Sequence, residues 1–293
     1  MNDPLRSKAD DLAAIYARYL QYAAKRGWGS PALRRTRDRK LTRLRAKGIV
    51  TVPQLLERLP RLSPSLRQFG IELIDLCSIH RAWPVLIELT SQRSTRVQCA
   101  DVLSRLKSGG KATEYFREMG RRQLVASKLD RSWLEAVILG LGWTGDPRAE
   151  EILVEIFERP DLPGWLRGDA GDKLGLCKRV TDRRTKLYRR CRAAALRGLD
   201  EDSIDVQFWS MYAIGSMATG PRCDAKNRHD FAEAISKLRL IAKHDHRLVP
   251  GYWWPMSAEA VDVIACIESG QWPDPEAAER YPYRGARGES PRN

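Results

Sequence analysis

Two dense groups of basic side chains are the residues of this sequence best suited to binding chemistry. Residues 34–47 hold eight Lys and Arg against one Asp, and residues 178–197 hold nine against one Asp. Arg39, Arg43 and Lys47 recur at every fourth position, which places them on one face of a helix. A row of cations on a helix can replace the counterions around a phosphate backbone, or it can pair with the carboxylates of an acidic protein. A third alternative is a solvated helix face that serves solubility alone.

The second group offers further contacts, because Arg183, Lys186 and Arg190 share a helical face and Tyr188 lies among them. The Tyr188 ring could stack on a nucleic-acid base. Residues 252–255 form an aromatic-rich loop, and Trp and Arg together dominate protein interfaces. The candidates for binding a protein partner are Arg183, Arg184, Lys186, Arg190, Trp253 and Trp254. The candidates for binding nucleic acid are Arg39, Arg43, Lys47 and Tyr188.

Catalytic and metal-binding patterns are weak by comparison. Asp169 and Asp172 stand near aromatic residues and could form a desolvated carboxylate site, but the same spacing fits a polar helix face. His229, His244 and His246 are close in sequence, yet zinc requires three or four ligands in good geometry. The sequence contains no Gly-rich phosphate loop, no G-x-S-x-G and no H-E-x-x-H. We expect a non-enzymatic protein with no metal, no cofactor and no evident small-molecule substrate.

The charge of the chain is uneven along its length. The 293 residues include 51 Lys and Arg against 37 Asp and Glu, which gives a net charge of +14. All of this excess lies in the first 130 residues, so a uniformly basic protein of the histone kind is excluded. A hydrophobic content of 43% excludes wholesale disorder and leaves enough apolar surface for a sizeable core.

The sequence predicts a cytoplasmic protein. The first residues lack the basic start and apolar run of a secretory signal, and no apolar run approaches the roughly 20 residues needed to span a bilayer. The six cysteines are scattered without any C-x-x-C pair, which is typical of buried, reduced thiols. We therefore expect no membrane partner.

Helical patterns recur along most of the chain, whereas the alternation typical of strands is nearly absent. Residues 131–159 carry two apolar helical faces separated by a turn at 144–147. Asp146 suits a helix N-cap and Pro147 the first helical position, where its missing N–H costs nothing. Comparable units recur about every 30 to 40 residues. This spacing predicts an all-α fold, an α-solenoid of antiparallel helix pairs.

Three segments carry a resemblance to a known family. Residues 136–149, with their Leu-Gly and Gly-Asp turn, resemble the HEAT repeats of the phycobilisome-lyase type. Residues 199–215 resemble the same repeat, although Gln207 stands where the family usually has Arg. Residues 248–264 resemble the closing repeat of bacterial HEAT proteins of unassigned role. The resemblance implies HEAT-like helix pairs, and such proteins serve as scaffolds, adaptors or, in a few families, lyases and DNA glycosylases.

These observations predict three regions: a basic helical cap over residues 1–47, a HEAT-like solenoid over 48–270 and a poorly ordered tail over 271–293. We expect a scaffold or adaptor that binds a protein partner, one with an acidic surface, in its concave groove. The alternative is a solenoid that binds nucleic acid, with or without chemistry like that of a DNA glycosylase. The two functions differ in the partner that the basic groups meet.

Overall fold

The structure, a computed structural model, describes residues 10–25, 30–142, 144, 146–176, 182–219, 225–249 and 254–273. These residues fold into helices and contain no β-strand; the two isolated bridges join Asp11 to Thr51 and Leu248 to Pro255. The all-α class is therefore confirmed. In this described part of the chain, no helix combines the length and the apolar character needed to cross a membrane.

The chain divides into two compact units, and two of the dividing points fall inside helices. The first unit comprises residues 1–116 and 130–140, and the second comprises 117–129 and 141–293. The helices that contain the dividing points are α8 (Lys111–Val125) and α9 (Arg131–Gly142). The predicted limits at residues 47 and 270 stay predictions, and residues 274–293 of the predicted tail lie outside the described residues.

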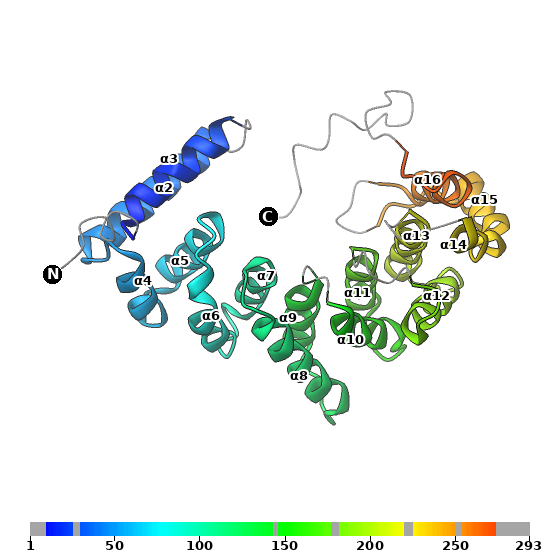
Figure 1. The fold of residues 1–293 in the computed structure, drawn as a ribbon, viewed down its shortest axis with the longest axis horizontal. Coiled ribbons are helices and arrows are strands. Elements are labelled where there is room, and N and C mark those ends of the chain that lie inside the picture. Colours follow the sequence, from blue (N-terminus) through cyan, green and yellow to red (C-terminus); the bar gives the residue numbers. More distant parts are fainter. Residues whose placement is uncertain are drawn as a thin grey trace. The chain divides into compact units, whose positions relative to one another are not determined.

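In the first unit, α5 is the helix on which its neighbours converge. Both α2 and α3 pack against α5, which in turn packs against α7 (Figure 1). The α-helices of this unit are α2 (Leu12–Lys25), α3 (Pro31–Ala46), α4 (Val52–Arg58), α5 (Pro64–Leu76), α6 (Trp83–Leu89) and α7 (Arg96–Arg105). Short 3₁₀ turns, η1 (Leu59–Arg61) and η2 (His80–Ala82), follow α4 and precede α6.

The second unit consists of packed neighbours in two layers. Helix α11 packs on α13 and α13 on α16, while α10 packs on α12 (Figure 1). The helices of this unit are α10 (Pro147–Glu158), α11 (Gly164–Leu176), α12 (Lys186–Gly198), α13 (Ile204–Thr219), α14 (Ala225–His229), η3 (Ala232–Ala234), α15 (Ile235–His244) and α16 (Met256–Ser269). The helix pair predicted over residues 131–159 is confirmed, and the Asp146 carboxylate caps α10 by accepting from the Arg148 N–H at 2.9 Å.

Glycines on one side of α11 allow α13 to approach closely. A Cβ on Gly168 would lie 2.8 Å from Cδ1 of Trp209 and 3.1 Å from the backbone oxygen of Asp205. A Cβ on Gly171 would lie 3.1 Å from Cβ of Trp209, and one on Gly164 would collide with Ser203. The contacts at Gly164 and the 2.8 Å contact at Gly168 are shorter than a Cβ tolerates, and the 3.1 Å contacts are tight. A larger residue at these positions would therefore displace neighbouring side chains or move α13 away.

Two buried arginines connect helices that are far apart in sequence. The Arg96 Nε donates to the Thr90 carbonyl at 3.0 Å, and its Nη1 contacts Asp130 at 3.1 Å. The Arg167 Nε donates to the Phe157 carbonyl at 2.9 Å, and its Nη2 pairs with Glu201 at 2.6 Å. The two arginine side chains are 8% and 7% exposed, so their bonds to the carbonyls are shielded from water, whereas the paired acids are 45% and 35% exposed.

The repetition of this arrangement is regular. In both cases the acid lies 34 residues after its arginine and just before the next helix, α9 or α13. The Arg167 guanidinium lowers the pKa of Glu201, chiefly through the hydrogen bond between them. Gln207 takes a similar place in α13, where its amide donates to the Leu199 carbonyl at 3.0 Å and accepts from Arg247 at 3.1 Å.

We predict that Arg167→Ala lowers the free energy of unfolding by about 1–3 kcal/mol, because it leaves the buried Phe157 carbonyl without a donor. Arg167→Gln should lower the free energy of unfolding distinctly less, because a glutamine amide can donate to such a carbonyl. Gln207 already does so in this chain, where its amide donates to the Leu199 carbonyl. Urea unfolding of the two variants measures the difference. Equal losses for Ala and Gln would contradict the role given to the carbonyl bond.

Candidate polyanion-binding surface

Helix α3 is held to the first unit by few side chains. Ser30 caps its start by accepting from the Leu33 N–H at 3.2 Å. Leu44 is fully buried and Leu41 is 9% exposed, and these two residues form the apolar contact of the helix. Arg37, with its side chain 14% exposed, pairs with Glu72 of α5 at 2.6 Å. Because Arg37, Leu41 and Leu44 face the rest of the first unit, they determine which way the remaining side chains of α3 point.

The opposite face of α3 carries a row of exposed cations, which we call the basic stripe: Arg35, Arg39, Arg43 and Lys47. Consecutive members are four residues apart, so they stand roughly 6 Å from one another along the helix axis. Within the described residues, no carboxylate lies within ion-pair distance of these four side chains. Arg58 donates to the Lys47 carbonyl at 2.8 Å and adds a further exposed cation at the end of the stripe.

The basic stripe does not serve the stability of α3. Cations four residues apart on a helix repel each other by about 0.2–0.5 kcal/mol per pair, and the stripe contains three such pairs. The first turn of α3 also contains no acid, although the helix dipole favours negative charge there. Only the cations of the last turn, Arg43 and Arg45, have the sign that the dipole favours. The net local repulsion would be relieved by an external anion.

The second basic group is largely neutralised inside the fold. Arg183 pairs with Asp230 through its Nε at 2.6 Å, and this bond lowers the pKa of the Asp230 carboxyl. Arg190 donates to Glu158 of α10 at 2.7 Å, and Arg197 donates to the other oxygen of the same carboxylate at 2.6 Å. These bonds join α12 to its neighbours, so Arg183 and Arg190 already have acidic partners.

Arg184 and Lys186 remain exposed, and within the described residues neither side chain has an acidic partner. Tyr188, in contrast, is 1% exposed, and its hydroxyl donates to Asp230 at 3.1 Å. The predicted stacking of Tyr188 on a base is therefore wrong for this conformation, because the ring is part of the core. The helical spacing placed Tyr188 near Arg183 correctly, but its apolar ring faces the neighbouring helices.

The aromatic loop also differs from the prediction. Trp253 lies outside the described residues. Trp254 is 7% exposed, and its side chain is hydrogen-bonded to Glu259 of α16. An interface anchor must be accessible to a partner, so Trp254 does not meet this requirement in the present conformation. Its contribution is to the packing of the last described helix.

The described carboxylates and histidines weighed for chemistry have other interactions in the structure. Asp172 pairs with Lys173 at 2.6 Å, and Asp169 also has an interaction partner. The His246 Nδ1 lies 3.1 Å from the Ser257 hydroxyl. Across the described ranges, no group of three or more His, Cys, Asp and Glu side chains is arranged to hold a metal ion. Cys223, which the sequence places near His229, lies outside those ranges.

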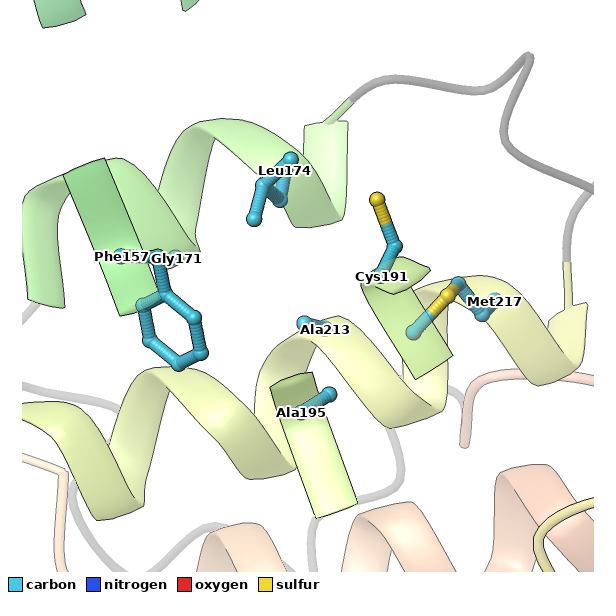
Figure 2. A pocket seen from close by; sticks show the side chains of 7 residues that line it. All are labelled: Phe157, Gly171, Leu174, Cys191, Ala195, Ala213 and Met217. Atoms are coloured by element: carbon cyan, nitrogen blue, oxygen red, sulfur yellow. The ribbon is translucent and has the colours of Figure 1, made fainter. Parts of the chain in front are cut away.

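An apolar cavity lies between α10, α11, α12 and α13. Figure 2 shows Phe157, Leu174, Cys191 and Met217 around it. Its volume is about 10 Å³, which is just enough for one water molecule, and its lining offers almost no polar partner for one. Burial raises the pKa of the Cys191 thiol, so this cysteine is not a reactive thiolate. The cavity is a packing defect of the core.

Glu259 is a buried acid that sequence analysis did not single out. It is 6% exposed, and within the described residues its Oε1 has no hydrogen-bond partner. Burial, followed by the nearby charge of Asp262, raises the pKa of Glu259 to about 8. Its small neighbours along α16, Ala258 and Ala260, give no local sign of this environment, which arises from the packing of α16 against α13 and α15.

Comparison with known proteins identifies no family for this chain. No protein-family model matches the sequence, and no curated protein matches it.

The raised pKa of Glu259 predicts a stability that depends on pH. Between pH 4.5 and about pH 8 the unfolded chain releases the proton of Glu259 while the folded chain keeps it. Stability therefore falls as pH rises through this window, by at most about 1.4 kcal/mol per pH unit, and is constant above it. Glu259→Gln removes the ionisable group and retains an amide near Trp254. The variant should be more stable than the natural chain at pH 8, with a smaller difference at pH 5.

Thermal melts at the two pH values measure this effect. Identical pH dependence in the variant and the natural chain would show that Glu259 is not protonated in the folded state at neutral pH.

Proposed function

We propose that the chain is a non-enzymatic α-solenoid of HEAT-like helix pairs that binds a polyanionic partner through the basic stripe of α3. The solenoid is supported by the buried arginines, because Arg96 and Arg167 make the same two kinds of bond, each to an acid 34 residues further along. The two arginines lie 71 residues apart, which is about twice the length of a helical repeat of 30 to 40 residues. In a stack of such repeats each helix pair buries its apolar face only against its neighbours.

One observation carries the choice of binding surface. The stripe residues Arg35, Arg39, Arg43 and Lys47 are exposed and have no acidic partner among the described residues. Of the four basic residues predicted to hold a protein partner, Arg183 and Arg190 are bonded to Asp230 and Glu158. The other two, Arg184 and Lys186, are exposed without an acidic partner among the described residues, but they do not continue into a row like that of α3. An arginine already bonded to a carboxylate must lose that bond before it can bind another anion. The described stripe has no ion pair to lose; its Arg39 Nε makes only a long bond, at 3.4 Å, to the Arg35 carbonyl.

The distribution of charge therefore favours α3 over α12 as the contact surface. It also supports a binding role for the stripe, since a helix that only needed solubility would carry both signs of charge on its exposed face, as α10 does with Arg148 and Glu151. Residues that reduce the stability of their own helix are expected where function requires them.

Two charge reversals of equal size separate binding from stability. Arg39→Glu places an acid between Arg35 and Arg43 and should raise the free energy of unfolding by about 0.5–1 kcal/mol. The same change should weaken binding to a heparin column or another polyanion by roughly tenfold or more at 0.1 M salt, because at least one ionic contact is lost. Arg190→Glu replaces the partner of Glu158 with a second acid. It should lower the free energy of unfolding by about 0.5–1 kcal/mol while leaving polyanion binding unchanged.

Chemical unfolding and salt elution from the column give both quantities for both variants. Equal loss of binding in the two variants would mean that net charge alone governs retention. Loss confined to Arg190→Glu would transfer the site to α12 and overturn the proposal.

A further inference from the structure

We infer that the partner of the basic stripe is the phosphate backbone of double-stranded nucleic acid, bound without sequence preference. This inference rests on the proposed function, namely that the stripe binds a polyanion, and it names the class of that polyanion. Three features of α3 support it: the composition of the exposed face, the spacing of its cations and the absence of carboxylates among them.

The exposed face of α3 lacks the side chains that a protein interface requires. Stable protein interfaces depend on buried aromatic or large apolar anchors surrounded by a polar rim. Helix α3 contains no aromatic residue, and its one exposed large apolar side chain, Leu33, stands one helical turn before Arg37, on the face that packs against α5. Around the stripe the exposed positions of α3 hold Arg, Lys, Thr and Ala, which supply charge but no large apolar or aromatic anchor.

The same composition argues against reading of bases. Recognition of base edges uses Asn, Gln or Arg presented into a groove, and binding of single strands uses aromatic platforms on which bases stack. The stripe has no amide and no aromatic side chain. Tyr188, the residue that the sequence offered for stacking on a base, is buried. An arginine or a lysine can also contact a guanine edge, but a regular row of cations without any amide suits contacts to the phosphates of a duplex, whose bases are already stacked.

The spacing of the stripe fits a regular line of negative charge. From Arg35 to Lys47 the helix rises roughly 18 Å, with a cation about every 6 Å. A strand of a duplex advances about 3.4 Å per phosphate, so the stripe spans about five base pairs. No acid interrupts this row, since Asp38, the acid of α3, lies on the flank of the helix between Arg34 and Arg45.

The test is the salt dependence of binding to a labelled random-sequence duplex of about 20 base pairs, measured by fluorescence anisotropy between 50 and 200 mM salt. Four phosphate contacts predict that the logarithm of the binding constant falls with the logarithm of the salt concentration with a slope of about −3.6. The triple variant Arg35→Gln, Arg39→Gln, Arg43→Gln should reduce the size of this slope by about 2.7. The control Arg184→Gln, Lys186→Gln, Arg189→Gln has the same change in net charge on exposed residues of the second group and should leave the slope unchanged.

Polyglutamate of matched charge and single-stranded oligothymidine are measured in parallel, and circular dichroism establishes that each variant is folded. Equal or tighter binding of polyglutamate, lost in the triple variant, would overturn the inference and leave the proposed function standing. Equal or tighter binding of the single strand would overturn the assignment to a duplex. A triple variant that binds all three polyanions like the natural chain would overturn both the inference and the proposed function.

Discussion

The described architecture depends on a buried arginine that bonds both to a helix-end carbonyl and to an acid 34 residues further along the chain. A helix end leaves carbonyls without partners, and burying them without donors is costly. Arg167 supplies the donor to Phe157 and is itself neutralised by Glu201, so one side chain satisfies a helix end and connects neighbouring helices. The glycines of α11 complete the contact, because Gly168 and Gly171 allow α13 to lie close enough for the pairing.

This arrangement divides the basic residues of the chain into two populations. Arginines such as Arg96, Arg183 and Arg190 hold helices together through carboxylates and are part of the fold. The cations of the basic stripe have no such partners among the described residues and are available to an external anion. The net charge of +14 does not distinguish the two populations. They differ in whether a basic side chain lies next to a carboxylate in the folded chain.

Local features of the fold were predictable, whereas long-range pairings were not. Asp146 and Pro147 signalled the start of α10 because capping is a property of adjacent residues. The spacing of Arg39, Arg43 and Lys47 likewise showed that they share a face. In contrast, Arg183 meets an acid 47 residues away and Arg190 one 32 residues away, and helical periodicity does not reveal such contacts. Tyr188 and Trp254 were misjudged for the same reason, since their burial depends on distant helices.

Hydrogen exchange of backbone amides, with and without a saturating double-stranded DNA, tests the central claim most directly. The claim is that the unpaired cations of α3, and not the paired arginines of α12, meet the partner. The account predicts slower exchange in Pro31–Ala46 and little change in Lys186–Gly198 when the duplex is present. Slower exchange in Lys186–Gly198 with α3 unaffected would contradict it, since the paired arginines would then be the ones that bind.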